Sequence, residues 1–162
     1  MLWIVQRCVQ YEFCRNTTNN TSGCTSSGWG TATGVTLSSL SDGQIYYYFV
    51  RSKDSLNNIS AWSTSTNSTQ DNAAPTTTLS PNGASCHTWI ALTLSCLDGS
   101  GAWCTSIQYK IVESASSCDT TWLLTYTGTF TVPSTSTKKV CYRSLDAVWN
   151  TETIQTSALF EA

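Results

Sequence analysis

Hydrophobic residues recur at every second position along most of the chain, and no segment keeps the spacing of an amphipathic helix. Residues 44–51 show this alternation most strongly, because they combine aromatic and β-branched side chains. Polar turns at 54–58 and 98–101 separate neighbouring alternating segments. The pattern therefore predicts an all-β chain of short antiparallel strands.

The alternating segments fall into two groups. The expected strands after the break are 76–79, 89–96, 106–112, 122–126, 129–132, 139–143 and 154–159. The expected strands before it are 3–8, 11–13, 35–40, 44–53 and 59–68. The polar stretch 68–75, which ends in a proline, separates the groups, so we expect one domain at 1–70 and a second at 71–162.

The two predicted domains share a short repeat. Residues 51–54 read Arg-Ser-Lys-Asp, and residues 143–146 read Arg-Ser-Leu-Asp. An asparagine follows four residues after each aspartate, at Asn58 and Asn150. A repeat that covers a strand and its following turn indicates two modules of one kind.

The strand and turn at 44–58, the Asp-Asn-Ala-Ala-Pro-Thr-Thr linker and the cysteine-bracketed turn at 94–104 resemble parts of a known family. They are similar to bacterial fibronectin type III and related immunoglobulin-like modules of secreted or surface proteins. The resemblance implies two tandem antiparallel β-sandwiches. It implies no single activity, because such modules serve as spacers, adhesins and filament parts.

When the expected strands are assigned to the strand order of that family, the first domain is incomplete. Residues 75–162 supply all seven strands, whereas residues 1–70 supply only strands C, C′, E, F and G. Without strands A and B, half of the first core would face water, so we expect other strands to cover it. Trp3 and Val5 are the residues expected beneath that cover, and MLWIVQRC lacks the features of a signal peptide, which suggests a biosynthetic start upstream.

Composition narrows the location and the partners. Eight cysteines in a chain with only 11% charged residues favour an oxidising, extracellular or cell-surface setting. A net charge of −2 without a basic cluster disfavours nucleic acid as a partner. No stretch reaches the ~18 apolar residues of a spanning helix, so we expect no membrane span.

The cysteines are expected to be structural. Two pairs flank predicted turns and a third pair remains within the second domain: Cys8–Cys14, Cys96–Cys104 and Cys118–Cys141. Zinc is the weaker alternative, because the chain has no Cys-x-x-Cys pair and no second histidine. Cys24 and Cys86 are unassigned; they could pair with each other, with a missing strand, with a neighbouring subunit, or in further bridges within the chain.

Catalysis is not expected. His87 is the only histidine of the chain, and its neighbour Cys86 is adjacent to it in sequence. Adjacent residues of a strand point to opposite faces, whereas a nucleophile and its base must converge in a pocket. We therefore expect a protein that is not an enzyme and needs no cofactor, with calcium as the one metal to weigh.

The calcium hypothesis follows from the resemblance, which implies that the linker and two turns of the second domain meet at one pole. The candidate oxygen ligands there are Asp71, Asp98, Asp146 and Asn150. Converging hard oxygen donors are what Ca²⁺ takes. The alternative is that these side chains only cap their own turns.

Trp103 and Trp149 belong to the same two turns. They could pack on the first module, form a platform for a sugar, or contact another subunit. The other tryptophans considered are expected in the core or on a sheet face: Trp3, Trp62, Trp89 and Trp122.

Two functions remain. The first is a structural subunit of an extracellular filament, sheath or surface appendage, whose first module is completed by strands from another copy or from an upstream segment. The alternative is an accessory carbohydrate-binding or adhesive module of a larger secreted enzyme or adhesin, with glycans as partners.

Overall fold

The computed structural model describes residues 8–85, 89–99 and 101–162, leaving out the side chains of Cys8 and Val9. Trp3, Val5, Cys86 and His87 lie outside the described residues. All regular secondary structure in the described ranges, apart from turns, is β-strand or β-bridge, and none of these residues forms a helix long and apolar enough to cross a membrane. The chain divides into two compact units, Met1–Asp71 and Asn72–Ala162.

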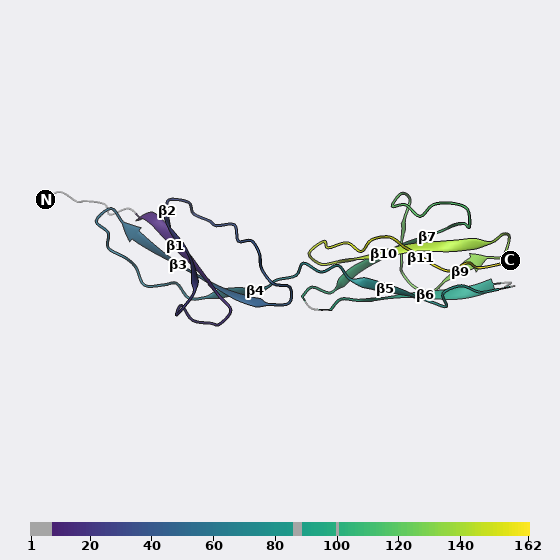
Figure 1. The fold of residues 1–162 in the computed structure, drawn as a ribbon, viewed down its shortest axis with the longest axis horizontal. Coiled ribbons are helices and arrows are strands. Elements are labelled where there is room, and N and C mark those ends of the chain that lie inside the picture. The colour runs from purple at the N-terminus through teal and green to yellow at the C-terminus, as the bar shows by residue number, and fades with distance from the viewer. Residues whose placement is uncertain (1–7, 86–88, 100) are drawn as a thin grey trace. The chain divides into compact units, whose positions relative to one another are not determined.

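The first unit contains a single antiparallel sheet, in the order β2-β1-β3-β4, within its described residues (Figure 1). Its strands are β1 (Cys8–Asn16), β2 (Thr25–Gly30), β3 (Ile45–Asp54) and β4 (Thr66–Thr69). β3 corresponds to the segment with the strongest alternation. It lies between β1 and β4, where aromatic and β-branched side chains can pack against neighbours on both sides.

The hairpin expected between residues 8 and 14 is wrong, because β1 runs through both positions without a turn. The chain reverses after β1 instead, at residues 17–24. There the Asn16 side-chain amide donates to the carbonyl oxygens of Asn20 at 2.9 Å and Ser22 at 3.0 Å. Residues 11–13 consequently belong to β1 and not to a separate strand.

The register assigns side chains to the two faces of this sheet. Phe13 lies opposite Val50, and Arg15 lies opposite Tyr48, so these four side chains share one face, which we call the inner face. The intervening residues form the outer face. There Arg51 Nε pairs with Glu12 at 2.6 Å.

Aromatic rings complete the outer face. The Arg51 guanidinium stacks on Trp62 at 4.4 Å and on Trp29 at 5.3 Å. The hydrogen bond from Ser26 and the ion pair with Arg51 hold the pKa of Glu12 below its ordinary value of 4.5. Trp62 is thus a sheet-face residue, as expected.

The strand expected at 35–40 does not form. This segment is irregular and lies along the inner face, where the Ser41 N–H donates to the Tyr46 hydroxyl at 3.0 Å. A strand needs a neighbouring strand that accepts and donates backbone hydrogen bonds along its whole length. No strand of the described residues of the first unit pairs with 35–40.

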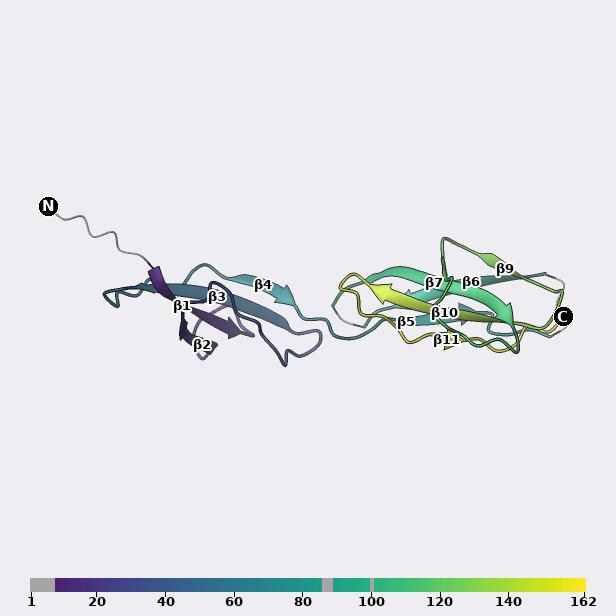
Figure 2. The same cartoon turned by 90° about the horizontal axis from the view of Figure 1, so that it is seen from above.

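The second unit contains two antiparallel sheets, in the orders β11-β10-β7-β8 and β5-β6-β9, which form separate layers in Figure 1. Figure 2 shows β10 flanked by β7 and β11. The strands are β5 (Thr76–Ser80), β6 (Trp89–Leu97), β7 (Cys104–Glu113), β8 (Leu124–Thr125), β9 (Phe130–Pro133), β10 (Lys138–Asp146) and β11 (Gln155–Thr156). All seven expected segments contain a strand, although β8 and β11 are only two residues long.

Both sheets of the second unit contribute to one core. The buried cluster consists of Leu79, Leu92, Leu94, Val132, Val140, Tyr142 and Phe160. In β5 and β6 every second residue is buried or half-buried, which is the alternation that the sequence shows. Full burial of each aliphatic side chain contributes roughly 1.5–3 kcal/mol, so this cluster dominates the stability of the unit.

A buried carboxylate joins the two sheets. Glu152 accepts hydrogen bonds from the N–H and hydroxyl of Thr77 in β5, at 3.0 and 2.6 Å. It also accepts from the N–H and hydroxyl of Ser144 in β10, both at 3.0 Å. Burial, and secondarily the charge of Glu152, raise the pKa of Tyr142 beside it.

Candidate functional site

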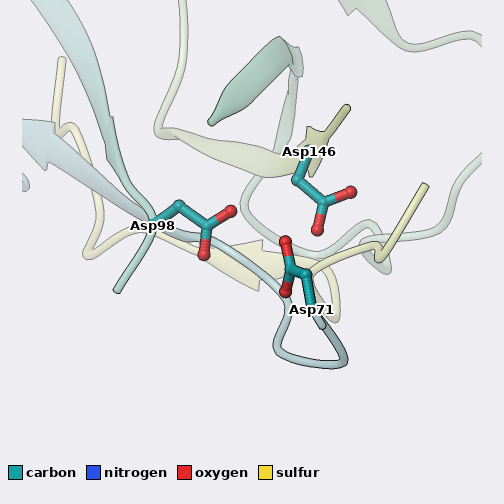
Figure 3. Close-up of side chains that lie close together, drawn as sticks. All are labelled: Asp71, Asp98 and Asp146. Carbon is teal, nitrogen blue, oxygen red and sulfur yellow. The ribbon is translucent and has the colours of Figure 1, made fainter. Parts of the chain in front are cut away.

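Three carboxylates converge at one end of the second unit. Asp71 belongs to the linker that leads into the unit, Asp98 to the turn after β6, and Asp146 to the end of β10. One carboxylate oxygen of each lies within 4.8 Å of the others. Figure 3 shows the three side chains turned toward a common point.

The turn after β10 positions Asp146, which is only 1% exposed. Its Oδ1 accepts from the N–H groups of Val148 and Asn150, both at 2.9 Å, and its Oδ2 accepts from the Asn150 side-chain amide at 2.7 Å. These bonds fix the carboxylate before any ligand arrives.

The first unit contains the same turn. Asp54 Oδ1 accepts from the N–H groups of Leu56 at 2.8 Å and Asn58 at 2.9 Å, and Oδ2 accepts from the Asn58 amide at 2.8 Å. The bonds from Asn58 lower the pKa of Asp54. Turn capping is therefore a property of the repeat, and what the second unit adds is the approach of Asp71 and Asp98.

The donor set suits a hard divalent cation. Three like charges within 4.8 Å repel one another, and Ca²⁺ is coordinated by such carboxylates. Both carboxylate oxygens of Asp98 are shielded from solvent, which strengthens their interaction with a nearby charge. The side-chain amide nitrogen of Asn150 donates to Asp146, and its amide oxygen is the atom that would act as a Ca²⁺ ligand. Asp71, Asp98 and Asp146 are the carboxylates that could hold Ca²⁺.

The described residues form three disulfides: Cys14–Cys24, Cys96–Cys104 and Cys118–Cys141. The second and third are pairs expected from the sequence. Disulfides of this number indicate an oxidising compartment.

The expected Cys8–Cys14 pair is wrong, because Cys14 is bonded to Cys24, with a Cα–Cα distance of 5.7 Å. Two residues six positions apart in one extended strand are separated by roughly 20 Å. A disulfide needs Cα atoms within about 7 Å, so it cannot join them. The pairing depends on where the chain turns, and the turn lies beyond Asn16.

Trp103 and Trp149 are 82% and 80% exposed. Their turns are tied together, because the Ala147 N–H donates to the carbonyl oxygen of Trp103 at 3.1 Å. Trp149 has a φ of 73°, and the equivalent Asn57 of the first unit has a φ of 64°. Two large apolar side chains are thus presented on neighbouring turns of the second unit.

The expectation that Trp122 lies in the core or on a sheet face is wrong. Its side chain is 92% exposed, and it precedes β8 in a loop with a φ of 55°. Trp89 does lie on a sheet face, in β6, and is 73% exposed. The Asp-Thr-Thr sequence just before Trp122 is a local turn signal that favours a loop at this position.

The inner face of the first unit is incompletely filled. A cavity of about 360 Å³ lies against it, and its walls include Phe13 and Tyr48 of the sheet with Val35 and Leu37 of the irregular segment. This cavity is partly open to solvent, and its walls are mostly apolar. An open apolar surface on a sheet face is a place that another chain segment could cover.

Comparison with known proteins adds no assignment: no protein-family model matches the chain, and no curated protein matches it significantly.

Proposed function

We propose that the chain is a structural subunit of an extracellular filament, sheath or surface appendage, built from two fibronectin type III-like β-sandwiches. In this proposal the first sandwich is completed by strands from a neighbouring subunit or from an upstream segment. The observation that carries it is the cavity on the inner face of the first unit, lined by Phe13, Val35, Leu37 and Tyr48.

The internal repeat supports this proposal. When Asp54 is aligned with Asp146, Val50 corresponds to Tyr142. Phe13 lies opposite Val50 in the first unit, as Tyr109 lies opposite Tyr142 in the second. Tyr142 is buried in the core that the β5-β6-β9 sheet covers, and Tyr109 packs against that core. Phe13 and Val50 are only half-buried, and the described residues of the first unit contain no equivalent of that sheet.

The irregular segment 31–44 agrees with a missing neighbour. In the second unit the corresponding strand is β9, and β6 is its one partner strand among the described residues. If the first unit lacks the strand equivalent to β6, residues 35–40 have no neighbouring strand with which to form backbone hydrogen bonds. Strand addition would supply that neighbouring strand and cover the exposed side chain of Val35.

The cysteine pattern agrees as well. Cys8 stands opposite Asp54 in the backbone register, as Cys104 stands opposite Asp146. Cys104 is bonded to Cys96, which belongs to β6. We therefore expect the completing strand to carry a cysteine that forms a disulfide with Cys8.

Completion by a neighbour has a consequence for assembly. A strand given by one subunit to the next is a head-to-tail contact, which continues as a fibre unless it closes into a ring. The disulfides and the low charge content suit a durable extracellular structure.

The experiment is to measure the molar mass of the purified chain by light scattering, before and after Val50→Glu. The new carboxylate would lie on the inner face, where completing strands must exclude water, and its burial without a partner is costly. We expect a high, concentration-dependent mass for the original chain and a mass near 17.6 kDa for the variant.

Asn67→Asp is the matched control, because Asn67 pairs with Tyr47 and so lies on the outer face. It adds a charge of the same sign to the same sheet and should leave the assembly intact. An unchanged circular dichroism spectrum, together with an intact Cys14–Cys24 disulfide, establishes that each variant still folds. An original chain that is monomeric at all concentrations would contradict completion by a neighbouring subunit, and with it the assembly of this chain into a fibre.

A further inference from the structure

Trp122 is exposed where the fold gives no reason for a tryptophan. Its indole is 92% exposed, more than any other large apolar side chain among the described residues. Its φ of 55° belongs to the left-handed region, which glycine and asparagine adopt far more readily than a bulky residue. Neither core packing nor backbone preference therefore accounts for this side chain.

The loop that carries Trp122 is fixed in place. Cys118 is bonded to Cys141, which is completely buried in β10. Lys110 of β7 pairs with Asp119 at 2.5 Å and donates to the carbonyl oxygen of Thr121 at 3.1 Å. The segment after β7 extends outward from the sheets in Figure 1. The indole is thus presented on a loop whose conformation is set before any ligand binds, which reduces the entropic cost of binding.

The residues that precede the indole are polar, and the half-buried Leu123 and the exposed Leu124 follow it. Asp119, Thr120 and Thr121 precede it directly and are all exposed. The Thr121 N–H, the Thr121 hydroxyl and Lys110 all bond to Oδ1 of Asp119. The Asp119 side chain is 53% exposed, so a ligand hydroxyl can reach it and donate a hydrogen bond to it.

We propose that Trp122 is the stacking platform of a binding site for neutral, β-linked pyranose chains. A pyranose with equatorial substituents presents a flat C–H surface that packs on an indole, and its hydroxyls at the ring edge bond to nearby polar groups. One exposed aromatic ring flanked by oxygen acceptors and hydroxyls provides both contacts. A protein partner would instead favour a ring of apolar neighbours around the tryptophan, which seals a hot spot from water.

This site is separate from the surfaces used in the proposed assembly. It lies on the second unit, whereas completing strands would cover the inner face of the first unit. The two proposals therefore fail independently. A sugar-binding monomer would contradict the assembly alone, and a fibre without sugar affinity would contradict the site alone.

The test is calorimetric titration of the full chain with cellohexaose and, separately, with chitohexaose. We expect saturable binding of at least one of them, with a dissociation constant of roughly 1 mM or below. Trp122→Ala should weaken that binding at least about tenfold, while Trp122→Phe, which keeps an aromatic face, should weaken it less. Trp89→Ala is the matched control, because it removes a tryptophan that is 73% exposed on a different element.

Each remaining outcome overturns the proposal. Absence of saturable binding of both oligosaccharides would do so, as would an equal loss in the Trp89→Ala variant. A Trp122→Ala variant that changes only the sedimentation of the chain would assign this loop to a protein contact instead. An intact Cys118–Cys141 disulfide and an unchanged circular dichroism spectrum establish that the variants fold.

Discussion

Trp149 and Asn57 occupy equivalent positions of the repeated turn, and both have left-handed backbone angles, with φ values of 73° and 64°. Asparagine tolerates this region because its short polar side chain can bond locally, whereas a bulky side chain crowds its own backbone. Since the Trp149 side chain is 80% exposed, little burial offsets the crowding. The turn therefore carries a conformational cost in the second unit that it lacks in the first.

Trp149→Asn is expected to stabilise the second unit by about 1 kcal/mol, because it relieves this crowding. The measurement is the free energy of unfolding from urea denaturation. The reverse change at the equivalent position, Asn57→Trp, should destabilise the first unit by a similar amount. Equal or lower stability of the Trp149→Asn variant would show that the indole makes compensating contacts.

At the residue scale, the sequence predicts disulfides between nearby cysteines better than disulfides that depend on where the chain turns. Cys96 and Cys104 could be paired in advance because they bracket one short turn. Cys14 could not be assigned correctly, since its partner depends on the chain reversing after Asn16. The exposure of Trp122 was harder to predict, because the turn signal before it competes with the strand-like residues that follow it.

At the scale of elements, Glu152 is the main polar connection between the two sheets of the second unit. Its carboxylate accepts from Thr77 of β5 and from Ser144 of β10. Removing it would leave two buried backbone N–H groups without their acceptor. Each such group costs about 1–3 kcal/mol.

Glu152→Ala should therefore lower the free energy of unfolding of the second unit by at least about 2 kcal/mol. Glu161→Ala, which removes an exposed glutamate near the end of the chain, should change it by less than about 0.5 kcal/mol. Chemical denaturation of both variants measures the difference. Similar stabilities would show that the sheets are held together by the apolar cluster alone.

The turns at the end of the second unit yield a prediction about calcium. If Asp71, Asp98 and Asp146 hold Ca²⁺, then Ca²⁺ stabilises the folded unit by about 2.7 kcal/mol at a hundredfold excess over its dissociation constant. The melting temperature should therefore rise in Ca²⁺ relative to EDTA, and the Asp98→Asn variant should lose most of that rise. A melting temperature that is the same in Ca²⁺, Mg²⁺ and EDTA would show that these carboxylates serve only the turns.

The elements of the two units were predictable to different degrees. Every expected segment of the second unit contains a strand, because each has partners within the unit and one buried face. Segment 35–40 has the alternating composition of a strand, but no strand of the described residues is paired with it. An alternating sequence shows that a segment can form a strand, but the strand forms only where a second strand is present to share its backbone hydrogen bonds.

At the scale of the whole chain, the repeat links the two units. The bond of Arg51 to Glu12 in the first unit corresponds to the bond of Arg143 to Gln108 in the second, at 2.6 and 2.9 Å. The β4-β3-β1-β2 sheet thus corresponds to the β11-β10-β7-β8 sheet. Among the described residues, only the second unit contains a further sheet, β5-β6-β9, and this difference motivates the proposed assembly.

Electron microscopy of the purified chain tests that assembly most directly. We expect fibres or closed rings in which density for strands spaced about 4.8 Å apart lies over the inner face of the first unit. In such a reconstruction Phe13 and Val50 would be covered by a neighbouring subunit. Isolated particles with a bare inner face, at concentrations where light scattering also reports a monomer, would contradict the account.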